Sequence, residues 1–410
     1  MQYSTNITGK IMQQEIMASH GSTQSKKCNS TICIFSALYA PSMGGVETYT
    51  QNLAAALDEM GCSVTVVTTH SHGGEALERH GNVEVIRLPC ISALGGRYPV
   101  PKHDKAYRRS MERLTNTAPD YVVVNTRFYP LSLEGLKFAR KQGITPVLVE
   151  HGSAHLSMGN PAVNAAIEAV EHTMTLLDKR QQPVCYAVSK KASDWLAHFG
   201  IASAGELPNA IDADAYVAGA SARNIREELS ISDDALLIAS AGRLIPEKGI
   251  LQLAGAAQML HQEGRNIHVV MAGAGPLETQ LAAIDAPNLH LVGKLSKPDL
   301  TALYQQADAY CLPSRSEGFA TTLLESAACG TPAIVTNVGG TDELIPNGRF
   351  GAIITDMEPE TIAHALRRAD DDRGALQAQG RAVAERVREI CSWQQTAQRA
   401  LDACERANKR

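Results

Sequence analysis

Two glutamates eight positions apart, Glu317 and Glu325, are the residues of this chain best suited to bind a polar ligand. An apolar run at positions 309–313 precedes them, and the surrounding pattern predicts a strand, a glycine turn and a short helix. Gly318 allows the chain to turn tightly, and the free amides at the start of the helix can bind an anion such as a diphosphate. The two carboxylates would then bind hydroxyl groups on either side of that anion.

The residues around the glutamates are more specific than their spacing, which also fits an ordinary strand–helix unit with solvated carboxylates. Positions 316–319 read Ser-Glu-Gly-Phe, and positions 325–332 read Glu-Ser-Ala-Ala-Cys-Gly-Thr-Pro. This sequence resembles the E-x7-E signature of the retaining GT-B glycosyltransferases, in particular family 4. The resemblance implies an α/β fold with two Rossmann-like, doubly wound domains that face a central cleft. It also implies that a sugar moves from a nucleotide-diphosphate sugar to a hydroxyl acceptor and keeps its anomeric configuration.

The hydrophobic pattern along the chain agrees with two such domains. Strand-like runs alternate with helical runs from Thr31 onward, and the alternation starts again near Ala235. The expected strands are 31–36, 64–68, 83–88, 121–125, 146–150 and 184–188, followed by 235–241, 267–272, 289–292, 309–313, 333–336 and 352–354. We expect a disordered leader at 1–28 and an acceptor domain at 29–205. A linker at 206–230 would lead to a nucleotide-sugar domain at 231–390 and a final helix at 391–410. The resemblance implies that the final helix crosses back to the first domain.

Length, charge and cysteine content narrow the class of protein. The 410 residues are too many for one ordinary core, and a net charge of −5 does not indicate nucleic-acid binding. No apolar run approaches the roughly 20 residues of a membrane-spanning helix. The nine cysteines form no Cys-x-x-Cys pair and several lie in apolar runs, which indicates buried, reduced thiols in a cytoplasmic protein.

Two cations follow the first strand of the second domain. Arg243 and Lys248 lie five positions apart in the segment 241–249, which resembles the family's G-R-x4-K-G element. A guanidinium and an ammonium can stabilise a diphosphate that gains negative charge as the glycosidic bond breaks. The turn at 273–276 reads Gly-Ala-Gly-Pro and lacks the third glycine of a nicotinamide fingerprint, so we expect a mainly structural role for it.

Two loops of the first domain are expected at the same cleft. Gly44 and Gly45 lie in a Pro-x-x-Gly-Gly-x-Glu segment that resembles a family loop, and glycines let backbone amides approach a phosphate or an acceptor. His151 follows a strand and precedes a glycine, and it resembles the family's active-site histidine beside the donor sugar. A plain strand–helix turn and a structural histidine are the alternatives to these two roles.

The resemblance also implies the donor contacts. Glu325 would bind the nucleotide ribose, Glu317 would bind hydroxyls of the donor sugar, and Leu295 lies where related enzymes contact the base. Backbone amides near the sugar and the phosphate would come from Gly318, Phe319, Ala320 and Thr321. The catalytic candidates are Arg243, Lys248, Glu317 and His151. Two other functions stay open: a sugar-nucleotide epimerase or hydrolase on the same fold, and a non-catalytic nucleotide-sugar-binding subunit. The base, the sugar and the acceptor are not identified by the sequence.

We expect neither a cofactor nor a metal. Asp212 and Asp214 match the Asp-x-Asp motif of metal-dependent GT-A transferases. Their segment, however, resembles the interdomain turn Pro-Asn-Gly-Ile-Asp of family 4. Ala210 replaces the glycine of that turn. The histidines other than His151 show no paired metal-ligand spacing.

A basic stretch at positions 97–114 has six basic and two acidic residues, with aromatic and apolar residues between them. A basic amphipathic helix can lie on anionic lipid, and related transferases that modify lipid-linked acceptors often dock in this way. We therefore expect peripheral contact with the inner face of a membrane and a glycan or lipid-linked acceptor. Polysaccharide, lipopolysaccharide or glycolipid assembly is the expected context. A solvated helix face is the alternative.

Overall fold

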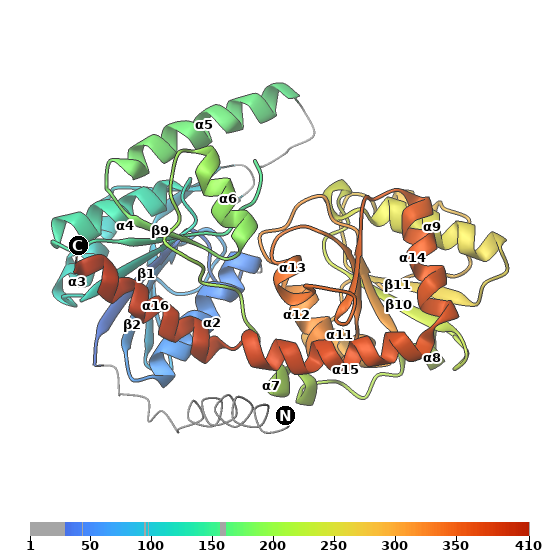
Figure 1. Ribbon diagram of the computed structural model, residues 1–410. Coiled ribbons are helices and arrows are strands. Elements are labelled where there is room, and N and C mark those ends of the chain that lie inside the picture. Colours follow the sequence, from blue (N-terminus) through green and yellow to red (C-terminus); the bar gives the residue numbers. More distant parts are fainter. Residues whose placement is uncertain (1–28, 43, 94–95, 97, 156–160, 410) are drawn as a thin grey trace, which may run out of the picture.

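The computed structural model describes residues 29–42, 44–93, 96, 98–155 and 161–409. The leader expected at 1–28 lies outside these residues. Figure 1 shows two lobes, each built around a sheet, with α15 (Arg373–Ile390) and α16 (Trp393–Asn408) running along one side from the second lobe to the first.

The first lobe contains a seven-stranded sheet in the order β3-β4-β2-β1-β7-β8-β9. Neighbouring strands run parallel except β3 and β4. The strand order reverses between β1 and β7, as it does in dinucleotide-binding folds. The strands are β1 (Thr31–Ser36), β2 (Ser63–Thr69), β3 (Leu77–His80), β4 (Val83–Leu88), β7 (Tyr121–Asn125), β8 (Val147–Glu150) and β9 (Val184–Ala187).

The second lobe repeats this plan in a six-stranded sheet, β12-β11-β10-β13-β14-β15, in which all neighbours are parallel. Every residue of β10 is buried, as expected for a parallel sheet covered on both faces. The reversal of strand order lies between β10 and β13. The strands are β10 (Leu236–Ala241), β11 (Ile267–Ala272), β12 (Leu289–Leu291), β13 (Ala309–Leu312), β14 (Ala333–Thr336) and β15 (Gly351–Ile354).

Helices connect most of the strands. In the first lobe they are α2 (Gly45–Glu59), α3 (Lys105–Asn116), α4 (Pro130–Lys141), α5 (Pro161–Lys179) and α6 (Lys190–His198). After them come α7 (Ala213–Ala218), α8 (Ile225–Glu228), η2 (Pro246–Lys248), α9 (Ile250–Gln262), α10 (Glu278–Ala282), α11 (Lys297–Gln306), α12 (Thr321–Ala328), α13 (Thr341–Leu344) and α14 (Pro359–Asp371).

The last helix, α16, packs on the first lobe although it follows the second in the chain. Its buried residues recur every three or four positions and form one apolar stripe, which includes Trp393, Ala397 and Leu401. These residues belong to the same hydrophobic core as β1 and α2. The Trp393 ring packs edge-on against Tyr49 of α2, with the ring centroids 5.5 Å apart.

The twelve strands expected from the sequence are all present, each within one residue of its expected bounds, so the prediction of two doubly wound sheets is confirmed. Strand β3 and the antiparallel pair β5 (Cys90–Ala93) and β6 (Tyr98–Pro101) were not predicted. They are short, and β3 is largely exposed, so their apolar signal is weak. In the described ranges, no helix is long and apolar enough to cross a bilayer.

Candidate active site

The carboxyl ends of β10 and β13 lie side by side in the second sheet, at the point where its strand order reverses. Ligands of doubly wound sheets bind at this point. The segment after β10 carries Arg243 and Lys248, and the segment after β13 carries Glu317. The sheet therefore places the two predicted cations and the first predicted glutamate on neighbouring strand ends.

Lys248 and Glu317 are in direct contact. Lys248 Nζ donates a hydrogen bond to Glu317 Oε1, and Ser314 Oγ donates to the same oxygen at 2.8 Å. Gly249 has a left-handed conformation with φ of 65°, and a Cβ added there would lie 2.1 Å from the carbonyl oxygen of Pro313. Glycine at this position thus lets the lysine turn lie against the end of β13. The side chains of Lys248 and Glu317 are only 18% and 13% exposed, so little solvent weakens their attraction.

Arg243 is placed differently from Lys248. Its side chain is exposed and makes no hydrogen bond or ion pair with any residue that the structure describes. The loop beneath it is fixed by two glycines. A Cβ added to Gly273 would lie 1.9 Å from the oxygen of Gly242, and one added to Gly275 would lie 2.4 Å from the oxygen of Leu244. This packing supports a structural role for the Gly-Ala-Gly-Pro turn. The Arg243 guanidinium, in contrast, is exposed and has no partner among the described residues.

Glu325 lies on the second turn of α12 and faces residues of α7 and α11. Burial raises the pKa of the Glu325 carboxyl to about 6, and the nearby Lys297 and Tyr216 partly offset this rise. Lys297 Nζ lies 5.3 Å from the centre of the Tyr216 ring. Burial, together with Glu317 and Glu325, raises the pKa of the Tyr310 hydroxyl. The two predicted glutamates therefore lie near the same buried phenol.

In the first lobe, His151 follows β8 beside the end of β7. His151 Nε2 lies 3.1 Å from Asn125 Oδ1, and Asn125 Nδ2 donates to Thr50 Oγ1 at 2.8 Å. Because an amide oxygen can only accept, this orientation makes Nε2 the protonated nitrogen and leaves Nδ1 as an acceptor. Tyr49 packs edge-on against the imidazole, with centroids 4.7 Å apart. Burial lowers the pKa of His151 to about 3, so the ring is uncharged at neutral pH.

The two lobes touch where these segments meet. A Cβ added to Gly318 would lie 1.8 Å from the carbonyl oxygen of His151, so only glycine lets the two backbones approach this closely. Ser153 Oγ donates to the carbonyl oxygen of Glu317 at 2.6 Å, and Ser189 Oγ donates to that of Gly318 at 3.0 Å. The predicted histidine and the turn that carries the first glutamate thus come from opposite lobes and share one interface.

A second pair of glycines, Gly339 and Gly340 after β14, packs on this turn from within the second lobe. A Cβ added to Gly339 would lie 2.7 Å from the oxygen of Gly318, and one added to Gly340 would lie 2.1 Å from the Phe319 ring. Residues of both lobes therefore enclose the turn at 317–319.

The other predicted residues lie at helix starts or on the second core. Ala320 precedes the first residue of α12, Thr321, so their amides belong to the start of that helix. Gly44 caps α2, and a Cβ added to Gly45 would meet no described atom within 4 Å. Leu295 packs on the second core. No hydrogen bond or ion pair in the described part of the chain joins these five residues to Lys248 or Glu317.

Sequence reasoning missed Asn125, Ser189 and Tyr216. Asn125 and Ser189 had a usable signal, because each is a polar residue at or just after the end of an apolar strand. Tyr216 lies in the expected linker and gave no such signal, because its position beside Glu325 depends on the packing of α7 against α12.

Asp212 and Asp214 make contacts that suit an interdomain turn. Asp212 Oδ1 accepts a hydrogen bond from the amide of Ala215 at 3.0 Å and caps α7. Asp214 Oδ1 lies 2.8 Å from Arg388 Nε, and the Asp214 side chain is 85% exposed. The two carboxylates are therefore engaged with different partners.

The chain is similar in sequence to known glycosyltransferases. Residues 43–215 match the family described as Glycosyltransferase Family 4, and residues 221–386 match the one described as Glycosyl transferases group 1. The chain is 25% identical over 389 residues to the D-inositol 3-phosphate glycosyltransferase of Paenarthrobacter aurescens, with 88% of this chain and 92% of the relative covered. It is 28% identical over 369 residues, with the same coverage, to the GDP-mannose-dependent alpha-(1-6)-phosphatidylinositol dimannoside mannosyltransferase of Mycobacterium tuberculosis.

Solved structures show the same fold. Sucrose-phosphate synthase of Thermosynechococcus elongatus matches with a TM-score of 0.71 at 18% identity, covering 92% of this chain and 99% of that one. HepE of Anabaena, solved with UDP and glucose, matches with a TM-score of 0.67 at 17% identity, covering 92% and 100%. Two family matches that together span most of the chain, and two doubly wound sheets in contact through their strand ends, lead to one conclusion. The chain belongs to the family 4 glycosyltransferases of the GT-B fold.

Proposed function

We propose that this glycosyltransferase retains the anomeric configuration while it moves a sugar from a nucleotide-diphosphate sugar to a hydroxyl of a glycan or lipid-linked acceptor. The main support is the contact between Lys248 and Glu317 at the strand reversal of the second sheet, next to His151 of the other lobe. A cation for the diphosphate, a carboxylate for the sugar and a neutral imidazole beside them are the groups that such a transfer needs.

Donor binding would replace the contact between Lys248 and Glu317. The diphosphate would form ion pairs with the ammonium of Lys248 and with the exposed guanidinium of Arg243. The carboxylate of Glu317, freed from its cation, accepts hydrogen bonds from hydroxyls of the donor sugar. The amides at the start of α12 add donors for the anion. Glu325 would bind the ribose, and Leu295 would contact the base.

The reaction would need no protein base. As the glycosidic bond breaks, the leaving diphosphate gains negative charge, and the contacts with Arg243 and Lys248 become stronger. The acceptor hydroxyl attacks the same face of the sugar and passes its proton to the departing phosphate oxygen. His151 is too weakly basic for that proton, but its Nδ1 can accept a hydrogen bond from a sugar hydroxyl. The loop at Gly44 and Gly45 would approach the acceptor from the first lobe.

The names of the relatives favour a polyol or lipid acceptor. One is a D-inositol 3-phosphate glycosyltransferase, and another is a GDP-mannose-dependent phosphatidylinositol dimannoside mannosyltransferase. We therefore place the reaction in polysaccharide, lipopolysaccharide or glycolipid assembly.

A thermal-shift screen of nucleotide sugars identifies the donor, because a ligand that binds only the folded chain raises its melting temperature by mass action. We expect one nucleotide sugar to stabilise the chain and to release nucleoside diphosphate when a lipid or glycan extract is added. Release that is equally fast without any acceptor would instead indicate a hydrolase. Binding without release in any extract would indicate a non-catalytic subunit.

Transfer is expected to continue in EDTA at 25 °C, because Arg243 and Lys248 supply the positive charge that a metal provides in GT-A enzymes. The measurement is nucleoside diphosphate release by protein dialysed against EDTA, with and without added Mg²⁺ or Mn²⁺. Complete loss of activity that either cation restores would make Asp212 and Asp214 candidate ligands again, to be tested by replacing each with asparagine.

We propose that α3 touches an anionic membrane through charge alone. Its exposed basic residues include Lys105, Arg108 and Arg109, whereas Tyr107 and Met111 pack on the first core and are not free to insert into lipid. Each basic residue near an anionic surface contributes about 1 kcal/mol. Screening shortens the range of this attraction from roughly 10 Å at 0.1 M salt to about 3 Å at 1 M.

Vesicle flotation tests this contact. We expect recovery with anionic vesicles at low salt, and much lower recovery when Arg108 and Arg109 are both changed to glutamate. Equal recovery with neutral and anionic vesicles would leave α3 as a solvated surface helix. Cys33, Cys185, Cys311, Cys391 and Cys404 are buried free thiols, which suits the reducing, cytoplasmic side of such a membrane.

A further inference from the structure

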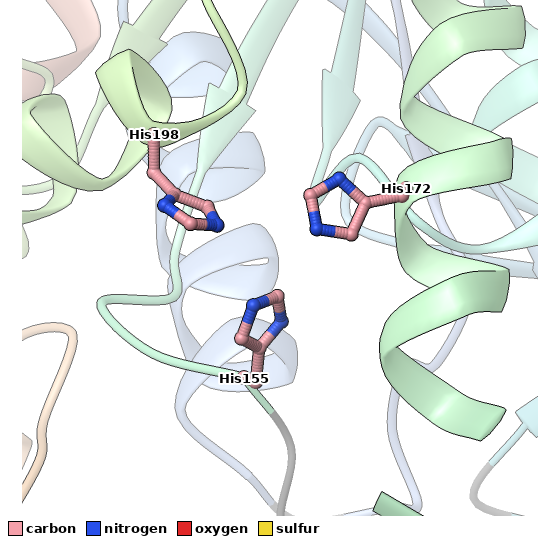
Figure 2. Close-up of side chains that lie close together, drawn as sticks. All are labelled: His155, His172 and His198. Carbon is pink, nitrogen blue, oxygen red and sulfur yellow. The ribbon is translucent and has the colours of Figure 1, made fainter. Parts of the chain in front are cut away.

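Three histidines that are far apart in the sequence come together in the first lobe. His155 lies in the segment after β8, His172 on α5, and His198 at the end of α6. Each histidine offers one ring nitrogen as a possible metal ligand, and these three nitrogens lie within 4.8 Å of one another. Figure 2 shows the three imidazoles arranged around a common space, each reaching it from a different element.

The contacts of His155 fix which of its nitrogens can bind a metal. Nδ1 lies 2.6 Å from Glu171 Oε2, and the same carboxylate pairs through Oε1 with Arg127 Nη2 at 2.6 Å. An ionised carboxylate accepts, so Nδ1 carries the proton and Nε2 keeps its lone pair. That Nε2 is buried and has no hydrogen-bond partner among the residues that the structure describes. A carboxylate on the far nitrogen is the arrangement that orients metal-binding histidines.

The other two rings are held by packing. His198 stacks parallel to Trp195, with centroids 4.9 Å apart and an interplanar angle of 4°. His172 packs against Phe199 at 4.8 Å. A fourth donor is close: Glu168 Oε1 lies 3.4 Å from His155 Nε2 and 3.9 Å from His172 Nε2. The side chains of His172 and Glu168 are 43% and 49% exposed, so an ion can reach the cluster from solvent.

We propose that His155, His172 and His198 bind a zinc ion, with the Glu168 carboxylate as fourth ligand. Imidazole nitrogens and one carboxylate suit zinc, whereas magnesium and calcium prefer oxygen ligands throughout. Nitrogens on a tetrahedral zinc at 2.0–2.1 Å lie about 3.4 Å apart. The present spacing therefore has to shrink by at most about 1.4 Å per pair, which rotation of the half-exposed rings can supply.

The zinc would act as a structural brace. It joins α5 and α6 to the segment that follows β8, and the same segment carries His151 and Ser153 to the interface between the lobes. Fixing His155 would anchor the chain four residues after His151 and two after Ser153. The ion stays outside the transfer chemistry, so the proposal does not rest on the proposed donor or acceptor.

Zinc binding to the full chain, purified without a histidine tag and dialysed against EDTA, tests the proposal. We expect one zinc per chain in competition with a chromophoric chelator, and a rise of a few degrees in melting temperature when zinc is about 100-fold above its dissociation constant. Mg²⁺ at the same concentration should change neither quantity. Co²⁺ should give the visible absorption of a tetrahedral site.

Matched variants locate the ion. His172→Gln and His198→Gln should each weaken binding by at least the 10- to 100-fold that follows loss of an outer-shell partner. His261→Gln, which removes an exposed histidine of α9, should leave it unchanged. So should His290→Gln, which breaks a second close pair, since His290 Nε2 lies 3.0 Å from His268 Nδ1. Circular dichroism checks that each variant is folded.

Three results would overturn the proposal. The first is absence of zinc binding, which would leave the two His155 nitrogens facing Glu168 and Glu171 alone. The second is equal affinity in the triad variants and the wild type. The third is metal-free protein with an unchanged melting temperature that has lost transfer at 25 °C, because the ion would then act in the chemistry and not in the fold.

Discussion

Replacing Lys248 by alanine should slow sugar transfer about 100-fold or more at saturating donor, the usual effect of removing one donor that stabilises developing charge. The ammonium lies at the strand reversal of the second sheet, in contact with Glu317 and largely shielded from water. A charge held there acts on the diphosphate in a poorly solvated environment, and alanine leaves Glu317 without its cation. The effect should therefore fall mainly on turnover and less on donor affinity.

Arg243→Ala should have a similar kinetic effect with less influence on the fold. The guanidinium has no partner among the described residues, so alanine leaves no group unpaired and the melting temperature should stay constant. Lys294→Ala is the matched control, because Lys294 is an exposed cation after β12 of the same sheet. Turnover and the Michaelis constant for donor are measured for all three variants. Near-native turnover in the Lys248 or Arg243 variant would refute the assignment of that residue to the leaving group.

Gly318→Ala should lower the kcat/KM of transfer about 100-fold, because shifts of about 1 Å in reacting groups have effects of this size. The added methyl carbon would lie 1.8 Å from the carbonyl oxygen of His151, which is backbone and cannot rotate away. The lobes must separate to remove the overlap. Each sheet has its own hydrophobic core, so the melting temperature should change little.

Gly348→Ala serves as the control for this substitution. Gly348 is exposed, a Cβ there meets no atom of the described residues within 4 Å, and its backbone is not left-handed. Enzyme kinetics and small-angle scattering are compared for the two variants. The Gly318 variant should show a larger radius of gyration. Full activity in that variant would mean that the approach of the two backbones is not needed for catalysis.

The sequence predicted the parts of this molecule that depend on local pattern. Apolar runs gave the strands, and glycines at their ends gave the turns that carry Arg243, Lys248 and Glu317. It did not predict the hydrogen bond from His151 to Asn125 or the approach of Gly318 to the His151 carbonyl. Each of these joins segments whose separation is set by the packing of whole elements. The same holds for His155, His172 and His198, which meet only because α5 and α6 lie beside the segment that follows β8.

The place of α16 has a consequence during protein synthesis. Trp393 and the other buried residues of α16 complete the core of the first lobe. The remaining buried residues of that core all lie between Ile32 and Ala210, so the last of them precedes Trp393 by roughly 180 residues. At about 5–20 residues per second, the first lobe leaves the ribosome some 10–40 s before this helix exists. Through that interval the α2 face that receives Trp393 is uncovered and available to chaperones or to other nascent chains. Final assembly of the first lobe is thus tied to completion of the second.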